Sequence, residues 1–392
     1  MAVRYRPWFN AVALSAALLA AGCTPRNVPA KDLGADIDEV AATLIKQPLL
    51  HSTSIAVVHR GKEFIRHHGD METGKPGPPT DATLYEIGSL SKTLAGTLMA
   101  KAVLENRVGL DDDVRRYLQG DYPNLQFTGE PIRIRHLLTH TSGLPNMLPE
   151  RANTVLADFT DARTPGELNA LYAGYGKDAF FRDLHGVQIE HAPGKDYAYS
   201  SAGTQLAAHI LEVVYAQDYE ALLRSFLRDS AGMREVAIKL SDTQIPRLAA
   251  GYHSDNPVPT TPMPQLPWGA SGNVKATVPE MLKYLKFQLA AGPVVAESHR
   301  ALATFDPEFS VGYSWNIVSG DPTKGLYYAH HGGVPRSQCY IYIMPKHDLG
   351  IFIITNQSGD QTARAMEVAV DTLVERIATR ERTGSDGVAM AR

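Results

Sequence analysis

The chain has 392 residues, of which 44% are hydrophobic and 20% are charged, and its formal net charge at pH 7 is −4. Such a composition supplies one large core or two joined parts, and it excludes a largely disordered chain. Without a basic excess, nucleic acid is not an expected partner.

The N-terminal residues have the features of a targeting segment. Positively charged residues precede an apolar run from Ala11 to Ala21, which is too short to span a bilayer. The run leads into Leu-Ala-Ala-Gly-Cys, ending at Cys23, which resembles a bacterial lipobox. We therefore interpret residues 1–22 as a signal peptide and 23–32 as a lipidated cysteine with its tether, on the periplasmic side of a bacterial membrane. Simple secretion with an unmodified Cys23 is the alternative.

The next part of the chain predicts a helix and a hairpin, then a helical region. Apolar spacing favours a helix from Asp36 to Leu49, and Thr53 to His67 favours a β-hairpin. Residues 89–241 are mostly helical in pattern, with loops rich in Pro and Gly. We interpret them as an insertion into a sheet domain.

The C-terminal part predicts a helix, four strands and a final helix. Thr277 to Leu289 is helical in pattern, with Thr277 as its N-cap, and Asp360 to Ala378 forms the last helix. The predicted strands are Val311–Val318, Gly325–His330, Gln338–Met344 and Gly350–Thr355. We therefore expect an α+β fold over 33–378, in which residues 33–88 and 242–378 form an antiparallel sheet flanked by the N- and C-terminal helices, and we expect 379–392 to be disordered.

Ser89 and Lys92 form the first candidate catalytic motif. A short apolar run reaches Gly88, and a helical pattern follows, so Ser89 lies at a helix start. There, free backbone amides and the helix dipole stabilise a developing alkoxide, and Lys92 projects from the same face one turn later. A lysine with a lowered pKa can serve as the base for a serine nucleophile. In the alternative reading, Ser89 is only an N-cap and Lys92 only a solvated side chain.

Two further motifs follow. Tyr199, with Ser200 and Ser201 after it, precedes a helix, and a phenol near a lysine can relay a proton; alternatively Tyr199 is a loop aromatic. His330-His331-Gly332-Gly333 ends an apolar strand. The glycines allow a substrate to lie close to the strand, and the Gly333 amide can join that of Ser89 as an oxyanion hole. The His pair has no third ligand at useful spacing, so we expect no metal and no other cofactor.

Together, these motifs resemble those of the serine β-lactamase and penicillin-recognising family, particularly its branch of class C β-lactamases, D-alanyl-D-alanine carboxypeptidases and esterases. Their order is similar to that family's Ser-x-x-Lys, Tyr-x-Asn and Lys-Thr-Gly or His-x-Gly elements. Ile132 to Pro145 looks like the branch's most recognisable loop. The resemblance covers roughly Leu33 to Ala378 and implies a β-lactamase/transpeptidase-like fold.

The resemblance implies that Ser89 is acylated, that Lys92 is its base partner and that Tyr199 relays protons, with either of the last two as the general base. Ser201 replaces the family's Asn, and His330 replaces its Lys; with Gly332 and Gly333 they make up the implied substrate-binding set. Because His330 is mostly neutral at pH 7, it weakens any anchor for a substrate carboxylate. Arg336 is expected to be a solvated strand residue, or to restore a cation if it turns into the cleft.

We therefore expect an exported serine hydrolase that acts on small-molecule or peptide acyl substrates, namely esters, D-amino peptides or β-lactams. Two alternatives stay open: a class C-like β-lactamase or D,D-carboxypeptidase proper, and a non-catalytic cell-wall-binding lipoprotein of the same fold. The membrane would be contacted only through the lipid anchor. The sequence does not define an oligomeric state.

Overall fold

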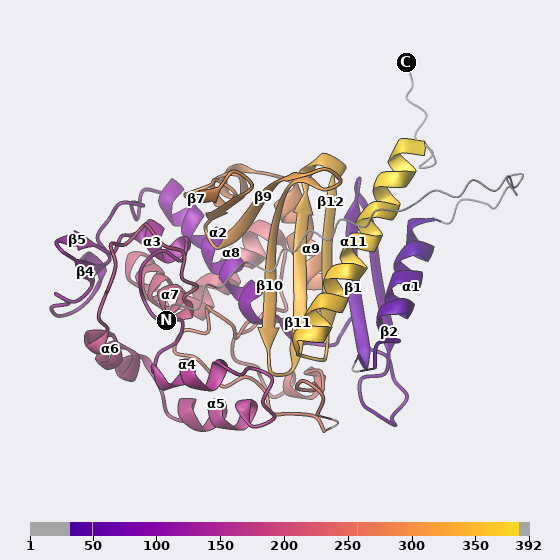
Figure 1. Cartoon of the computed structure of the whole chain (residues 1–392), viewed down its shortest axis with the longest axis horizontal. Helices are drawn as coiled ribbons and strands as arrows, with labels where there is room; N and C mark the ends of the chain where they lie inside the picture. Colours follow the sequence, from indigo (N-terminus) through magenta and orange to yellow (C-terminus); the bar gives the residue numbers. More distant parts are fainter. Residues whose placement is uncertain (1–31, 49, 257, 384–392) are drawn as a thin grey trace, which may run out of the picture.

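The computed structural model describes residues 32–48, 50–256 and 258–383. Cys23 and the predicted signal peptide lie outside these residues. Within them, the centre is an eight-stranded sheet in the order β2-β1-β12-β11-β10-β9-β8-β7, with antiparallel neighbours throughout (Figure 1). Its strands are β1 Ser52–His59, β2 Lys62–Gly69, β7 Ala303–Asp306, β8 Phe309–Gly312, β9 Trp315–Asp321, β10 Gly325–Val334, β11 Ser337–Met344 and β12 Leu349–Thr355. The predicted α+β fold and its hairpin are confirmed.

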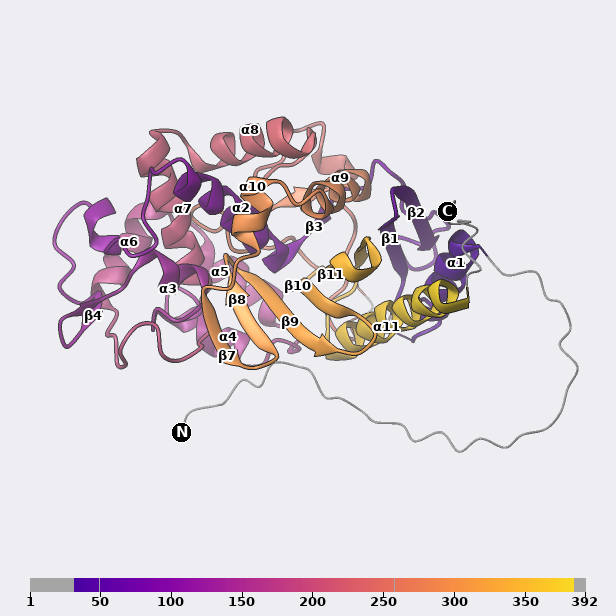
Figure 2. The same ribbon diagram turned by 90° about the horizontal axis from the view of Figure 1, so that it is seen from above.

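Two helices from opposite ends of the chain cover one face of the sheet. These are α1 (Leu33–Leu44), whose N-cap Asp32 accepts a hydrogen bond from the Ala35 amide, and α11 (Asp360–Thr383). Side chains alternate along each strand, so Ile55 and Val57 of β1 pack under these helices while Ala56 and Val58 face the opposite side. Figure 2 shows α1 and α11 side by side on this layer.

The opposite face of the sheet carries the larger core and the helical part of the chain. Helix α9 (Val278–Leu289) packs on β1 and β12, with Thr277 as the predicted N-cap. The other helices on this side are α2 Ser91–Leu104, α3 Ile134–Leu138, α4 Arg151–Leu156, α5 Thr164–Tyr172, α6 Lys177–Gly186, α7 Ser201–Tyr215, α8 Tyr219–Ala231 and α10 Pro293–Ser298. Two further sheets have two short antiparallel strands each. One pairs β3 (Tyr85–Glu86) with β6 (Lys275–Ala276), and the other pairs β4 (Gln126–Phe127) with β5 (Glu130–Pro131).

The prediction of one strand from Val311 to Val318 is wrong, because this segment contains the end of β8 and the start of β9. Tyr313 and Ser314 form a tight turn between them, with φ of +50° and +66°. Neither residue type marks such a turn in sequence. The turn is held from outside, since the Ser314 amide donates to the Leu138 carbonyl at 2.8 Å.

The predicted end of the last helix is also wrong. Helix α11 continues past Ala378 to Thr383, so the expected disorder does not apply to these last described residues. Arg376 and Arg380 of α11 form ion pairs with Asp36 of α1, whose side chain is buried. These contacts between the chain ends extend the ordered domain to Thr383.

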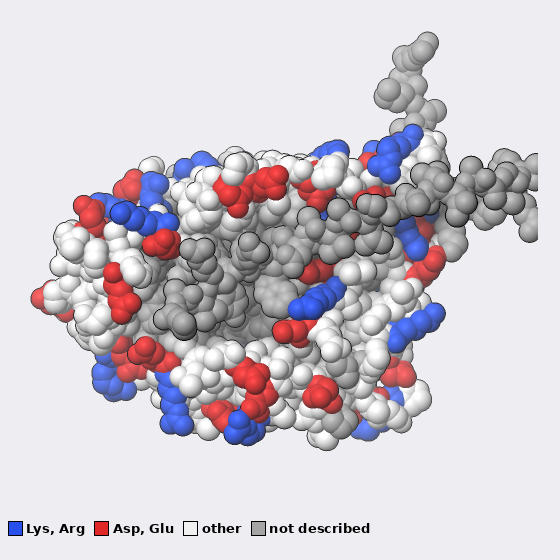
Figure 3. Space-filling model, in the orientation of Figure 1, with Lys and Arg blue, Asp and Glu red and all other residues white. Residues whose placement is uncertain are grey.

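Three smaller boundaries differ from prediction. Helix α1 ends at Leu44 rather than Leu49, β10 continues beyond His330 to Val334, and β7 was not predicted. In the described part of the chain, no helix combines the length and apolarity that crossing a membrane requires. Charged side chains of both signs are interspersed over the face shown in Figure 3.

Candidate active site

Ser89 lies in the 3₁₀ turn η1 (Gly88–Leu90), which leads directly into α2. Gly88 has φ of +53°, and a Cβ atom there would stand 2.8 Å from the Gly333 amide nitrogen, so only glycine fits. The Ser91 hydroxyl donates to the Gly88 carbonyl at 2.7 Å and anchors the turn. Ser89 itself is half-buried, which leaves the predicted nucleophile at the start of a helix, as expected.

Lys92 is completely buried, and its amine reaches the Ser89 hydroxyl. Nζ donates to Ser89 Oγ at 3.1 Å and to the backbone carbonyl of Ser271 at 2.6 Å. Both acceptors are uncharged, so no opposite charge compensates the ammonium for its loss of hydration. Burial therefore lowers the pKa of Lys92 to about 7. About half of the amines are therefore neutral at pH 7 and able to accept a proton.

Tyr199 completes the group around Ser89. Its side chain hydrogen-bonds the Ser89 side chain, and its ring centroid lies 4.7 Å from Lys92 Nζ. Burial raises the pKa of Tyr199 well above its ordinary value, so the phenol keeps its proton at neutral pH. The neutral phenol can therefore donate a proton beside Ser89, and the neutral form of Lys92 can accept one.

The His-His-Gly-Gly motif lies where β10 approaches the Ser89 turn. Strand β9 pairs with β10 only as far as Ala329, and from there the edge of β10 faces η1. A Cβ atom on Gly332 would stand 2.2 Å from the Ile87 carbonyl oxygen, so glycine is required for this approach. The Gly333 amide lies beside Gly88, which brings a second N–H donor close to Ser89.

His330 is buried and uncharged at neutral pH. Its Nδ1 lies 2.7 Å from the His331 carbonyl oxygen, so Nδ1 carries the proton and Nε2 is left as an acceptor. Burial, with a smaller contribution from the charge of Lys92, lowers the pKa of His330 to about 3. The position where the resemblance implies a lysine therefore supplies no positive charge.

Neither prediction for Arg336 is correct. The side chain is neither solvated nor in the cleft: only 9% of the residue is exposed, and the guanidinium donates to the Ala249 carbonyl. Burial lowers the pKa of Arg336, while nearby Glu86 acts in the opposite direction. Arg336 lies in the two-residue turn between β10 and β11, and this turn packs against residues 249–251.

Ser201 begins α7 and lines a narrow recess next to the Lys92 contact. Its amide donates to Asn146 Oδ1 at 3.3 Å. The recess is also lined by Met147, Leu148, Tyr172, Phe180, Ala202, Gln205, Leu266, Pro267 and Ser271. Gln205 Nε2 donates to Ser271 Oγ at 2.9 Å and thereby fixes the residue whose carbonyl holds Lys92.

Sequence reasoning missed Asn146, Gln205, Ser271 and also His140. Ser271 acts through its backbone carbonyl, which has no signature in sequence, and it is 179 residues from Lys92. His140 lies in the loop that the resemblance singled out, but the loop itself suggested no role for it. Its ring centroid is 4.5 Å from that of Tyr199.

The described residues contain no group of three or more His, Cys, Asp or Glu side chains that could hold a metal ion. The one thiol among them, Cys339, is buried and donates to the Ile87 carbonyl at 3.2 Å, which supports η1 from below.

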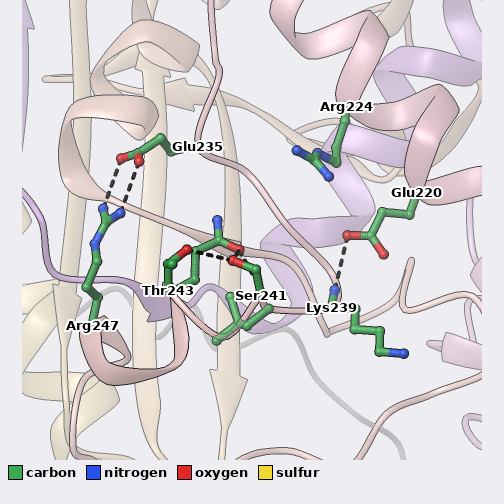
Figure 4. A pocket seen from close by; sticks show the side chains of 9 residues that line it. Glu220, Arg224, Glu235, Lys239, Ser241, Thr243 and Arg247 are labelled. Carbon is green, nitrogen blue, oxygen red and sulfur yellow. Dashed lines mark hydrogen bonds and ion pairs between the residues drawn. The ribbon is translucent and has the colours of Figure 1, made fainter.

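A surface hollow of about 480 Å³ opens elsewhere, between α8 and residues 235–247 (Figure 4). Arg247 donates to both carboxylate oxygens of Glu235, at 3.0 and 2.9 Å. Glu220 accepts hydrogen bonds from the backbone amides of Ile238 and Lys239. None of the predicted site residues lines this hollow, so we assign it no part in the chemistry.

The fold and the Ser–Lys–Tyr group define a serine hydrolase scaffold of the β-lactamase and penicillin-binding type. A family model described as Beta-lactamase matches residues 37–374, so the chain belongs to the beta-lactamase family.

Two curated relatives are distant in sequence. Protein flp of Staphylococcus aureus (strain N315) is 24% identical over 340 residues, covering 84% of this chain and 64% of that protein. A Beta-lactamase of Providencia stuartii is 26% identical over 255 residues, covering 65% of this chain and 59% of that protein. The match to Protein flp thus spans less than two thirds of that relative's length.

Among solved structures, the chain is similar to a Beta-lactamase/D-alanine carboxypeptidase from Yersinia pestis, solved in complex with citrate. The TM-score is 0.72 with 20% sequence identity, and the match covers 88% of this chain and 98% of the other. At this level of identity, the likeness establishes the fold.

Proposed function

We propose that this protein is a serine hydrolase that forms an acyl-enzyme at Ser89. The observation that carries the proposal is the Ser89 hydroxyl held between a buried amine, 3.1 Å away, and a protonated phenol. A serine needs a neighbouring base to attack a carbonyl, and a lysine that is neutral at working pH provides one.

The proposed acylation uses three side chains and two amides. Lys92 takes the Ser89 proton as Oγ bonds to the substrate carbonyl carbon, and the amides of Ser89 and Gly333 donate to the resulting oxyanion. Tyr199 then protonates the leaving oxygen as its bond to carbon breaks, and regains a proton from Lys92.

In deacylation a water molecule takes the place of the leaving group. It passes a proton to Tyr199 while Tyr199 passes its own to Lys92, and the water oxygen bonds to the acyl carbon. Lys92 then returns a proton to Ser89 Oγ as the bond from Oγ to the acyl carbon breaks, so that an ester yields an acid and an alcohol.

Among the proposed acyl substrates, the site favours esters without a carboxylate near the scissile bond. His330 is neutral, Lys92 is only half protonated at pH 7, and the buried guanidinium of Arg336 donates to the Ala249 carbonyl. A substrate carboxylate would lose hydration in the cleft without meeting a fixed cation. D-amino peptides and β-lactams, which carry such a group, are the second candidates.

The test is intact-mass analysis and turnover with two probes, a p-nitrophenyl ester and a fluorescent penicillin. We expect turnover of the ester, a weaker reaction with the penicillin, and neither with Ser89→Ala. Faster acylation by the penicillin would favour the class C-like β-lactamase or D,D-carboxypeptidase. No adduct and no turnover in folded protein would reject the hydrolase and favour the non-catalytic cell-wall-binding lipoprotein.

We also propose that the protein is exported and anchored to a bacterial membrane through lipid on Cys23, because a lipobox-like sequence follows the apolar run. Expression in a bacterial host with an alkyne-tagged fatty acid tests this. The label should appear on the wild-type chain and on Ser89→Ala, and it should be lost from Cys23→Ser. Equal labelling of Cys23→Ser would reject the anchor.

A further inference from the structure

His140 holds the backbone on both sides of Tyr199. Its carbonyl accepts a hydrogen bond from the Ala198 amide at 2.7 Å, and its Nδ1 accepts one from the Ser200 amide at 3.2 Å. The residue between these two bonds is the phenol that contacts Ser89. One residue of a distant loop therefore fixes the segment that delivers Tyr199 to the site.

His140 also limits the position of the Tyr199 ring. The two ring centroids are 4.5 Å apart at an interplanar angle of 39°, and Lys92 lies against the same phenol. His140 is 2% exposed and adopts φ of +57°, a left-handed backbone that an ordinary side chain avoids. This strained conformation, in a buried loop, places both the carbonyl and the imidazole against residues 198–200.

The imidazole leaves a hydrogen-bond donor unused. Because Nδ1 accepts the Ser200 N–H, a neutral ring carries its proton on Nε2. Burial, with a smaller contribution from the charge of Lys92, lowers the pKa of His140 well below its ordinary value, so the ring is neutral. Nε2 is buried without a partner among the described residues. An unpaired buried donor lowers stability, so this side of the ring adds nothing to the fold, whereas the imidazole does contact residues 199 and 200.

We propose that His140 is a positioning residue for Tyr199, which it orients for proton donation to the leaving group. This inference rests on the proposed function, because it assigns His140 a part in the same reaction. In acylation, a displaced Tyr199 impairs protonation of the departing oxygen but leaves the Ser89–Lys92 pair intact. Loss of His140 should therefore matter most where the leaving group needs a proton. Deacylation starts from the same acetyl-enzyme for every acetate ester, so kcat/KM isolates the acylation half of the reaction.

The experiment compares two acetate esters, p-nitrophenyl acetate, whose leaving group departs without a proton, and ethyl acetate, whose leaving group requires one. For His140→Gly, which tolerates the left-handed backbone, we expect kcat/KM for the ethyl ester to fall on the order of 10²-fold, with a change of about threefold or less for the p-nitrophenyl ester. His140→Asn keeps an acceptor near the Ser200 amide and also tolerates positive φ, so it should recover most of the loss. Tyr199→Phe should show the same dependence on the leaving group, with little added by His140→Gly.

Equal losses for both esters, or no loss, would overturn the positioning role. A second readout does not depend on turnover: in a crystal structure of His140→Gly, Tyr199 should be displaced from Ser89, and an unmoved phenol would overturn the proposal. If wild-type protein hydrolyses neither ester and Ser89 is not acylated, the proposed function fails, whereas the crystallographic result still decides whether His140 positions Tyr199.

Discussion

Burial favours the neutral forms of both side chains that face Ser89, so at neutral pH the Tyr199 phenol keeps its proton and a large fraction of Lys92 has lost one. Loss of hydration lowers the pKa of the Lys92 amine and raises that of the Tyr199 phenol, because in each case the ion is the less favoured form. The result is a neutral base and a neutral acid on either side of one hydroxyl. Three predictions about single residues, Lys92 and its partner Ser89, depend on this arrangement.

The pH dependence of acylation should report Lys92. The neutral amine is the active form, so log kcat/KM should rise with unit slope below about pH 7 and level off above it. His330, with a pKa of about 3, should contribute nothing between pH 5 and 9. A pH–rate profile with the p-nitrophenyl ester measures this. A limb near the ordinary lysine pKa would show that burial does not tune the amine.

Ser89 and Lys92 should act as one unit. Each of Ser89→Ala and Lys92→Ala is expected to lower kcat/KM by at least about 10³-fold, and the double variant should lose little more, because removing either partner removes the activated nucleophile. Steady-state kinetics of the three variants measures the coupling. A small Lys92→Ala loss that adds to that of Ser89→Ala would contradict the role of the base.

Lys92 should also reduce stability. Its pKa is about 7 in the folded protein and near 10.5 when exposed, so between these values the unfolded state binds more protons and stability rises with pH. At pH 7 the buried amine is therefore unfavourable, and Lys92→Met should raise the free energy of unfolding by about 1–3 kcal/mol, after allowing for two lost hydrogen bonds. Thermal unfolding measures this, with Ser89→Ala as the control near the wild-type Tm. A lower Tm for Lys92→Met would contradict it.

At the scale of elements, the site depends on how closely β10 approaches the 3₁₀ turn η1. Strand β9 does not pair with β10 beyond Ala329, and from there η1 lies against the free edge of β10. Gly88 on one side and Gly332 on the other remove the side chains that would separate the two backbones. Both amides proposed for the oxyanion hole therefore depend on this contact.

Gly332→Ala should damage both activity and stability. The added methyl group would meet the Ile87 carbonyl oxygen at 2.2 Å and Cys339 Sγ at 2.7 Å, so η1 and β10 must separate. We expect kcat/KM to fall by about tenfold or more, with a loss of stability of about 1–3 kcal/mol. Kinetics and thermal unfolding on the same samples measure the two effects.

Two matched glycines separate these effects. The methyl group added by Gly96→Ala would stand 1.9 Å from the Tyr313 carbonyl oxygen, in a contact that does not involve Ser89. This variant should lower stability with a smaller change in kcat/KM. Gly166→Ala in α5 meets nothing within 4 Å, so it should leave kcat/KM unchanged and raise stability slightly, because alanine favours a helix more than glycine does. If Gly332→Ala behaves like Gly166→Ala, the close approach is not needed.

At the scale of the whole molecule, the two ends of the chain close one layer of the fold. Strand β12 pairs with β1, and helices α1 and α11 pack side by side on the same face (Figure 2). Asp36 of α1 is buried and meets Arg376 and Arg380 of α11. The last turn of α11 is thus part of the domain.

Truncation tests this closure. A chain that ends after Ala378 loses the Arg380 contact to Asp36 and leaves a buried carboxylate with one partner fewer. Its Tm should be lower by several degrees than that of a chain ending after Thr383, corresponding to about 1–3 kcal/mol. Asp36→Asn in the longer chain should reproduce part of the loss. Equal Tm values for the two truncations would show that the predicted end at Ala378 was adequate.

The sequence by itself determined the fold class, the order of the three motifs and the placement of Ser89 at a helix start. It also located the hairpin, the N-cap Thr277 and most of the strand β11. These features depend on residue type and on spacings of a few residues, so local patterns are sufficient to predict them.

Tertiary structure alone decided how far burial shifts the pKa values of the site: it lowers that of Lys92 to about 7 and that of His330 to about 3, and it raises that of Tyr199 so that the phenol keeps its proton. It also supplied partners that no pattern marks, such as the Ser271 carbonyl on Lys92 and the His140 contacts around Tyr199. The turn between β8 and β9 and the last turn of α11 were set in the same way, by neighbours distant in the chain. Contacts of this kind depend on three-dimensional proximity, which a local sequence pattern does not encode.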